Sequence, residues 1–406
     1  MLNTTKLKAL SIMLLTGGLL VLSTPSFAAD SFMNLLRILR DRGSISQDEF
    51  NALANASQTE EADAQKAATQ AAPTPGWWND TKVSGRMYYN LSNIDDHRSG
   101  VRQTDSGWAF DIKRFYIGID HKFSDMFSGN ITTDFSYDSG PVAATQLYIK
   151  KAYLDAKIND MLDVRLGSTD LPWVPFVEGV YGYRYLEQVL VDRTKFGTSA
   201  DWGIHASGKL GGPFQYALAL VNGAGYKHPG VHSDTVDFEG RLSANWNDFI
   251  VAVGGYVGKL GKDLQGATTP HTANRFNVLG AYKTSQITVG VEYMYADNWT
   301  SITSVAADTA EGAGVFASYQ FNPQWSVFGK YEYMEPNQKT KPALSDDYYN
   351  IGVNYSPAKV VNLSLVYKHD EAGLGSLSTG NGTIGGLTSI TSGDYDEVGL
   401  FGEFRW

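Results

Sequence analysis

Cysteine is absent from this chain of 406 residues, which excludes disulfides, thiolate metal sites and cysteine nucleophiles. Charged residues make up only 19 % of the chain while aromatic residues reach 13 %, a composition unlike that of a disordered protein. The formal net charge of −10 argues against a nucleic-acid partner, whose binding surface needs basic side chains. Beyond residue 29 no apolar run approaches the roughly 20 residues that a membrane-spanning helix needs. The length fits either two or three ordinary domains or one large barrel.

Residues 1–28 have the pattern of a secretory signal peptide. Lys6 and Lys8 give a positive start, an apolar stretch follows, and Ser26 and Ala28 precede the expected cleavage site. An uncleaved membrane anchor is the alternative, and the short apolar stretch with its small-residue site favours cleavage. Removal of the two lysines leaves 31 basic and 43 acidic residues, a net charge of −12.

Residues 29–76 are expected to form a helical or linker segment in the periplasm. Apolar residues within 33–39 recur at helical spacing, and a basic residue and a glycine end the run. Ser46 and Glu49 have the spacing of a capping box that begins a second helix. The composition of 57–76 fits either a polar helix or a linker, and the whole segment either packs against copies of itself or acts as a tether.

From residue 77 to residue 406 one pattern repeats, in which segments of about ten residues alternate apolar and polar side chains. Val289 and Val291, for example, alternate with Thr288 and Glu292. A period of two is typical of a strand with two unlike faces. Seven tight turns alternate with eight long polar connections, so the sequence predicts sixteen strands. This arrangement indicates an all-β fold, a transmembrane antiparallel β-barrel of the outer-membrane type.

Aromatic residues gather near the tight turns, as in the interfacial girdle of an outer-membrane barrel. They are Phe123, Phe127, Phe214, Trp246, Phe249, Phe321 and Trp325. A soluble β-sandwich would also alternate, but it has no reason to ring its tight turns with aromatic side chains. The apolar faces predict lipid contact for Tyr89, Ile117, Phe135, Leu154, Val289, Leu363 and Leu400. The last strand carries Phe404 and Trp406 on its outward face, and it resembles the assembly signal of bacterial outer-membrane proteins.

A barrel of sixteen strands leaves room for an aqueous channel, and the polar inward face suits a wetted wall. The connection at about 170–200 is long and rich in aromatic residues, so we expect it to fold into the lumen as the third loop. A rigid external cap is the alternative. The connection 371–393 is dominated by Gly, Ser and Thr, and we expect it to be mobile and external.

Several stretches resemble the phosphate-selective porin O and P family. The resemblance is carried by residues 113–118, 134–136, 151–155 and 164–168, by Pro172, and by 192–193, 202–204 and Gly208. Good matches cover about 110–210, and they imply a homotrimer of sixteen-stranded barrels with the third loop inside. One departure is Asp170, which stands where the family tends to carry a basic residue.

Inward-facing basic and acidic residues are nearly equal in number, which is ordinary for a general porin. Basic residues cluster beside the third loop, however, and this favours a mild anion preference at the constriction. The candidate anion path consists of Arg114, Lys151, Arg165, Arg184, Arg193 and Lys195. The predicted function is passive diffusion of small hydrophilic solutes and ions through an outer-membrane porin that prefers anions or phosphate. A non-selective or sugar-preferring porin, or a structural and adhesive barrel, is the alternative.

The sequence has no spacing of nucleophile and base that indicates an enzyme, and no cofactor or metal is expected. His228 and His232 lie four apart in one connection, where solvated loop histidines are the simpler interpretation. The predicted location is the bacterial outer membrane, reached by export through the periplasm. The expected partners are the lipid bilayer, lipopolysaccharide, other copies of the chain and small anions or other hydrophilic solutes.

Overall fold

A computed structural model describes residues 26–70, 76–138 and 144–406. Most of the expected signal peptide falls on residues 1–25 and lies outside the described residues. The chain divides into two compact units, Met1–Gly76 and Trp77–Trp406, and each is described by itself.

The first unit contains two helices, α1 (Ser26–Asp41) and α2 (Gln47–Gln70), which contact one another. The capping box is present: the backbone N–H and the hydroxyl of Ser46 both donate to Glu49 Oε2, at 2.8 and 2.9 Å. The backbone N–H of Glu49 donates in return to Ser46 Oγ at 3.2 Å. Of the two alternatives for the polar stretch after residue 57, the structure shows a helix, which continues as far as Gln70. No described helix is long and apolar enough to cross a membrane.

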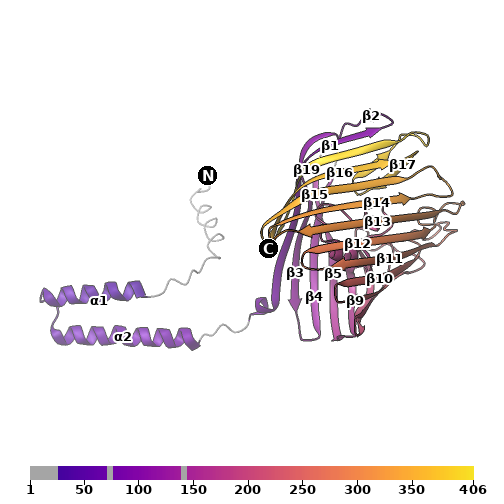
Figure 1. The fold of residues 1–406 in the computed structure, drawn as a ribbon. Coiled ribbons are helices and arrows are strands. Elements are labelled where there is room, and N and C mark those ends of the chain that lie inside the picture. Colours follow the sequence, from indigo (N-terminus) through magenta and orange to yellow (C-terminus); the bar gives the residue numbers. More distant parts are fainter. Residues whose placement is uncertain (1–25, 71–75, 139–143) are drawn as a thin grey trace, which may run out of the picture. The chain divides into compact units, whose positions relative to one another are not determined.

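The second unit begins with a short 3-10 helix, η1 (Trp77–Asp80), and continues as a β-barrel (Figure 1). The wall strands are β1 (Thr81–Arg98), β3 (Gly107–Lys122), β4 (Phe127–Asp138), β5 (Ala144–Asn159), β6 (Leu162–Asp170), β7 (Ala200–Gly211), β8 (Phe214–Val221), β9 (Asp237–Trp246), β10 (Phe249–Gly258), β11 (Ala273–Lys283), β12 (Ile287–Asp297), β13 (Thr309–Gln320), β14 (Trp325–Glu335), β15 (Asp346–Ala358), β16 (Val361–Ala372) and β19 (Gly393–Arg405). The short β2 (Val101–Arg102) extends the first hairpin, and β17 (Ser376–Thr379) with β18 (Gly382–Gly385) forms a separate two-stranded hairpin.

Each wall strand is antiparallel to the next, and β19 pairs with β1 from Arg86↔Arg405 to Arg98↔Gly393, which closes the barrel. The 17-stranded sheet minus the two-residue β2 leaves sixteen wall strands, so the predicted fold class is confirmed. The chain folds this way because the period-two pattern continues along most of each hydrogen-bonded ladder, with local register shifts such as those in the β1–β3 and β4–β5 ladders. A closed barrel is also the one sheet arrangement that satisfies every backbone group within hydrocarbon.

The outward face of the wall is apolar and exposed, and the inward face is covered and carries buried polar and charged side chains beside apolar ones. Val289 and Leu400 are 40 % and 45 % exposed, whereas Glu292 and Lys368 are 2 % and 0 % exposed. The aromatic residues at the tight turns are also exposed, which agrees with the predicted girdle. Trp406 lies on the outward face, where its ring contacts the rings of Phe404 at 5.5 Å and Phe115 at 6.1 Å.

Phe135 departs from the predicted lipid-facing set because it is buried. The strands β3 and β4 pair only from Ile117↔Thr133 to Lys122↔Ser128. This ladder does not extend to the residues of β3 before Ile117 or to those of β4 after Thr133. Asp134 Oδ1 accepts a hydrogen bond from the backbone N–H of Phe115 at 3.4 Å, in place of a strand partner. The ring of Phe135 packs edge-on against Phe115 at 6.3 Å, and this contact shields it.

We expect Val289→Arg to impair folding into lipid vesicles while Thr288→Arg is tolerated. Arg on the lipid face costs about 2–4 kcal/mol near the bilayer midplane. Thr288 instead lines a cavity of about 270 Å³ inside the barrel, where a guanidinium stays hydrated. Urea unfolding of each variant in vesicles measures the difference, and equal losses would contradict the assignment of the two faces.

Candidate functional site

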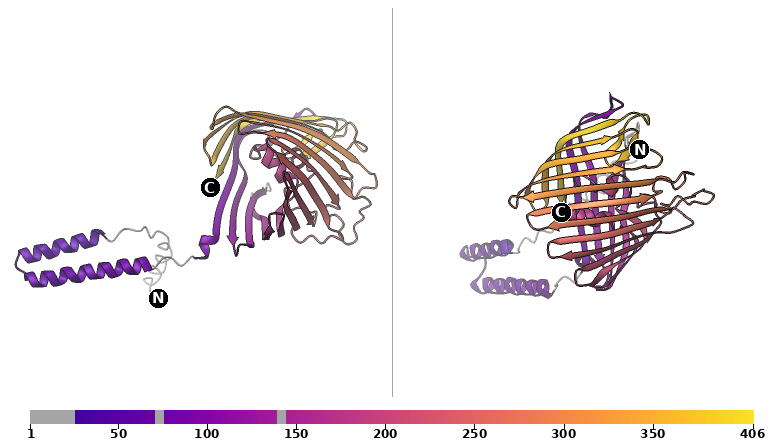
Figure 2. Two further views of the ribbon diagram at one scale, coloured as in Figure 1. Left: turned by 60° about the horizontal axis from the view of Figure 1, so that its bottom comes forward. Right: turned by 45° about the vertical axis from the view of Figure 1, so that its right-hand side comes forward.

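The connection between β6 and β7, residues 171–199, lies inside the ring of strands and is named the inner loop (Figure 2). It contains α3 (Val174–Tyr181) and α4 (Leu190–Arg193). The first contacts β11 and β12, and the second contacts β13. Its apolar side chains share one core with inward-facing residues of the wall, which include Leu279 and Met294. The aromatic and apolar content of the loop is thus buried against the inside of the barrel.

Polar contacts hold the inner loop at both helices. Lys283 Nζ donates to the carbonyls of Gly179 and Val180 at 2.8 and 2.9 Å, close to the C-terminus of α3. A cation in this position is favourable because a helix C-terminus carries unsatisfied carbonyls and partial negative charge. At the start of α4, the backbone N–H of Leu190 donates to Glu292 Oε1 at 3.2 Å.

Arg193 was predicted to belong to the anion path, and its burial contradicts this. Its side chain is 0 % exposed and pairs with three carboxylates: Glu332 at 2.5 Å, Asp346 at 2.6 Å and Asp370 at 3.2 Å. Its guanidinium also lies 4.3 Å from the ring centroid of Tyr348. A permeating ion has no access to it. Arg193 instead fastens α4 to β14, β15 and β16.

Several cavities remain between the inner loop and the wall, and Arg184 of the inner loop lines three of them. Cavity A, about 330 Å³, is lined among others by Lys195, Lys227 and Arg275. Cavity B, about 710 Å³, is lined among others by Arg86, Lys150 and Lys151. Cavity C, about 600 Å³, is lined among others by Lys113, Glu187 and Glu397. Arg184 therefore marks the point where these three cavities adjoin.

A β-bulge in β3 changes which side chains face cavity C. In the ladder between β1 and β3, Tyr88 is opposite Arg114, and the next residue, Tyr89, is opposite Ile112. Lys113 is the extra residue, so the alternation is interrupted there. Its Nζ lies 5.0 Å from the ring centroid of an inward-facing residue, Phe401. Lys113 and Arg114 consequently both reach the lumen.

A second bulge does the same in β5. Thr132 is opposite Lys151 while Thr133 is opposite Ile149, which makes Lys150 the extra residue. Lys150 Nζ donates to the Tyr116 hydroxyl at 3.2 Å and lines cavity B. Sequence reasoning from strict alternation missed the inward placement of Lys113 and Lys150. The available signal was two consecutive basic residues within a strand whose other face contacts lipid, where a charge is costly.

Every arginine that lines the three cavities has a carboxylate partner. The pairs are Arg86–Glu403 at 3.4 Å, Arg114–Asp134 at 3.2 Å, Arg275–Glu239 at 3.1 Å, Arg405–Glu403 at 3.6 Å, and Arg184 with Glu178 and Asp192. Because each guanidinium has a carboxylate within 4.0 Å, with Glu403 shared by Arg86 and Arg405, these arginines contribute more to the shape of the passage than to its net charge.

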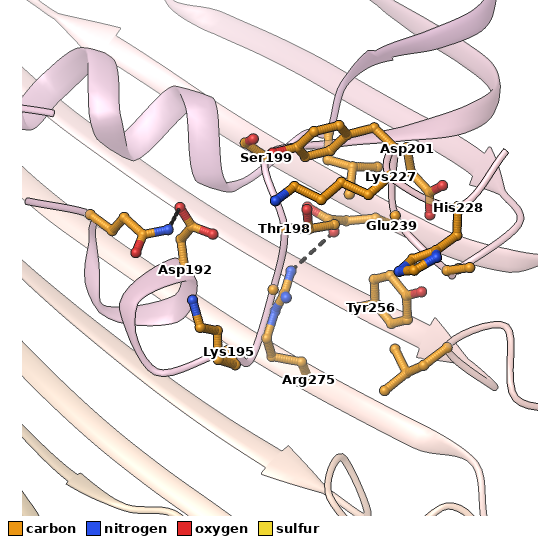
Figure 3. Close-up of a pocket in the computed structure, with 18 of the residues that line it drawn as sticks. Asp192, Lys195, Thr198, Ser199, Asp201, Lys227, His228, Glu239, Tyr256 and Arg275 are labelled. Carbon is orange, nitrogen blue, oxygen red and sulfur yellow. Dashed lines mark hydrogen bonds and ion pairs between the residues drawn. The ribbon is translucent and has the colours of Figure 1, made fainter. Parts of the chain in front are cut away.

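Four lysines that line the same cavities differ from these arginines because they have no carboxylate partner in the part of the chain that the structure describes. Among the described residues, no carboxylate lies within 4.0 Å of the ammonium groups of Lys113, Lys150, Lys195 and Lys227. Figure 3 shows Lys195 and Lys227 without an ion pair, beside Arg275 with its bond to Glu239. Within the same part of the chain, two carboxylates that line the cavities, Asp111 and Asp201, also lack a basic partner. In total, ten basic and nine acidic side chains of the described residues line the three cavities, so the lining carries an excess of one positive charge.

The structure brings three of the predicted site residues together. Arg114, Arg184 and Lys195 all line cavity A, and the first two also line cavity C. Lys151 lines cavity B, but its Nζ lies 2.6 Å from Asp170 Oδ2. Asp170, the residue that departs from the family pattern, thus neutralises one predicted cation.

Arg165 lies apart from this group. Its Nε donates to Asp155 Oδ1 at 2.8 Å, and it lines a separate cavity of about 260 Å³. The inward set predicted from the sequence therefore contains residues of three kinds: unpaired cations, paired cations along the passage, and cations outside it.

The connection after β16 also differs from the prediction of a mobile external loop. It forms the β17–β18 hairpin, and Thr379 Oγ1 and Asn381 Nδ2 donate to Asp370 Oδ2 at 3.4 and 3.2 Å. Asp370 also pairs with Arg193, so the hairpin and the inner loop share one carboxylate. The Gly- and Ser-rich composition indicates flexibility, and it contains no sign that the connection binds a buried carboxylate.

Burial lowers the pKa of Lys195 and of Lys227, and the charge of Arg114 lowers both further, while Asp192 and Glu187 act in the opposite direction on Lys195. The two lysines should lose their charge at a lower pH than an exposed lysine, whose pKa is about 10.4. We expect any anion preference of the channel to decline at a lower pH than the one at which exposed lysines lose their charge, while arginines stay charged. Reversal potentials measured across this range test this, with Lys227→Arg as the control that keeps its charge. A flat profile up to about pH 10.5 would contradict it.

No protein-family model and no curated protein matches the chain. Solved structures do match. An anion-selective porin from Comamonas acidovorans has 11 % identity and a TM-score of 0.60, with 80 % of this chain and 99 % of that chain covered. The trimer form of OmpT from Vibrio cholerae has 13 % identity and a TM-score of 0.55, with 80 % and 99 % covered. OmpF of Salmonella typhi, solved with daunomycin, has 13 % identity and a TM-score of 0.52, with 81 % and 99 % covered. These likenesses show that the chain has the porin fold.

Proposed function

We propose that this protein is a porin of the bacterial outer membrane that lets small hydrophilic solutes and ions diffuse passively, with a preference for anions. The observation that carries the preference is the set of four lysines that line the three cavities without a carboxylate partner among the described residues, beside arginines that each have one. Charges in a narrow and partly dehydrated passage act at a lower effective dielectric than bulk water. Acidic residues in distant connections are screened beyond about 8–10 Å at physiological salt.

The channel role is supported by the sixteen-stranded wall, since barrels of this width leave an aqueous lumen. The exposed apolar belt and its aromatic girdle support a location in the outer membrane. In this proposal residues 1–28 direct export through the periplasm, and 29–76 form a periplasmic segment. Phe404 and Trp406 mark the last strand for assembly. The trimer form of one structural neighbour supports a homotrimer, embedded among lipopolysaccharide.

Selectivity for phosphate, which the resemblance to the O and P family implies, needs several free cations around one dehydrated anion. The pairing of Lys151 with Asp170 removes one such cation. The proposal is therefore a moderate anion preference, and phosphate is one of several anions that share the path.

Planar-bilayer recording of the purified protein tests the proposal. In a tenfold KCl gradient we expect discrete conductance steps and a reversal potential whose sign shows that chloride is more permeant than potassium. Added phosphate should shift this reversal potential. A reversal potential at zero would favour a non-selective or sugar-preferring porin. If the protein is folded in vesicles, as judged by its resistance to urea, and yet shows no conductance, a structural or adhesive barrel would be favoured.

A further inference from the structure

Two of the unpaired lysines approach the same pair of tyrosine rings. Tyr148 of β5 and Tyr226, in the connection between β8 and β9, have ring centroids 6.0 Å apart. Lys227 Nζ lies 5.0 Å from the centroid of Tyr148, and Lys150 Nζ lies 5.8 Å from the centroid of Tyr226. Two ammonium groups from different elements are thus joined by an aromatic surface.

The two lysines belong to different open spaces of the lumen. Lys227 and Tyr226 line cavity A, whereas Lys150 lines cavity B, and Arg184 borders both cavities. The tyrosine pair therefore lies between one cation on the side of cavity A and another on the side of cavity B.

The like charges near this tyrosine pair repel one another. Besides burial, the charges of Arg114, Lys195 and Lys150 lower the pKa of Lys227, while Asp134 acts in the opposite direction. Asp134 is already engaged by Arg114 at 3.2 Å and by the Tyr148 hydroxyl at 2.9 Å. Cation–π contact stabilises an ammonium group only modestly where water still reaches it. An incoming anionic group therefore relieves a repulsion that the protein itself leaves uncompensated.

We propose that Lys150 and Lys227 hold the two ends of a small dicarboxylate whose apolar spacer lies along Tyr148 and Tyr226. This deepens the proposed porin function by naming the class of solute that its passage recognises. A monocarboxylate satisfies one of the two lysines and leaves the other uncompensated. A compact oxyanion such as phosphate carries both charges on one group and has no carbon chain to place on the rings.

Inhibition of chloride current in planar bilayers provides the test, with glutarate and valerate as probes because they share five carbons and differ by one carboxylate. We expect half-inhibition by glutarate at a concentration at least tenfold lower than by valerate. Lys150→Gln and Lys227→Gln should each raise the glutarate concentration needed for half-inhibition about tenfold. The same variants should change the valerate concentration needed for half-inhibition less than twofold. Lys150→Arg, which keeps the charge, should restore inhibition by glutarate.

The matched control is Lys157→Gln, because Lys157 is 60 % exposed and lies 3.8 Å from Asp160 in a tight turn, away from the three cavities. It should leave both probes unchanged. Equal inhibition by glutarate and valerate, or an equal loss of both in the lysine variants, would overturn the proposal. Inhibition by inorganic phosphate as strong as that by glutarate would show that a compact dianion is preferred and would overturn the spacer argument. Absence of chloride current altogether would instead refute the porin function on which this inference rests.

Discussion

Replacement of Arg193 by alanine should release the inner loop from the wall and raise the single-channel conductance several-fold, with strong current noise. The change leaves Glu332, Asp346 and Asp370 buried without their common cation. Removal of one partner from a buried ion pair costs about 3–5 kcal/mol, because the remaining charges stay desolvated. Detachment of α4 relieves this cost by letting water reach the carboxylates.

The control for this prediction is Arg165→Ala. Arg165 is 35 % exposed and pairs with Asp155 at 2.8 Å on the wall, so its loss should cost about 1 kcal/mol or less and leave the conductance unchanged. Single-channel recording of both variants, together with limited proteolysis of the inner loop, measures the difference. If the Arg193→Ala channel keeps the original conductance and resists protease, Arg193 is not the anchor of the loop.

Most of the fold could be predicted from the sequence because a barrel wall depends on few variables. The period-two pattern separates the lumen face from the lipid face, and the alternation of tight turns and long connections fixes the number of strands. Residues such as Val289 and Leu400 lie where their own apolar character places them. Aromatic content also identified the inner loop as a segment that needs a wall to pack on.

The candidate site was harder to predict because it depends on exceptions to that pattern. Lys113 and Lys150 reach the lumen through bulges, and a bulge shifts the register by one residue without changing composition. Two adjacent basic residues in one strand were the visible sign. Strict alternation places one member of each pair inward and the other outward, so it does not predict that both members reach the lumen.

Ion pairing was the other feature that the sequence does not contain. Arg193 and Lys195 are two residues apart in the inner loop, yet the first is enclosed by carboxylates from three strands and the second lines cavity A. The partners of Arg193 are more than a hundred positions away in the chain. Only the closed wall determines which cations are neutralised, and therefore which ones an anion can meet.

Replacement of Arg184 by glutamate should reverse the ion preference of the channel from anions to cations. Arg184 lines all three cavities, so a permeating ion passes close to it whichever space it enters from. The change removes one positive charge and adds a negative one beside Glu178 and Asp192, which lose their partner. Two unit charges about 4 Å apart interact by about 4 kcal/mol at an effective dielectric of about 20, and even a fraction of this changes a permeability ratio more than tenfold.

Reversal potentials in a KCl gradient measure the effect of Arg184→Glu, and Arg184→Gln should give an intermediate value because it removes the charge without adding one. Arg165→Glu is the matched control, since the same charge reversal outside the three cavities should move the reversal potential little. Equal shifts in Arg184→Glu and Arg165→Glu would mean that the total charge of the lumen decides selectivity. A dominant shift at Arg184 would instead mean that selectivity is set where the three cavities adjoin, because Arg184 is the basic side chain that lines each of them.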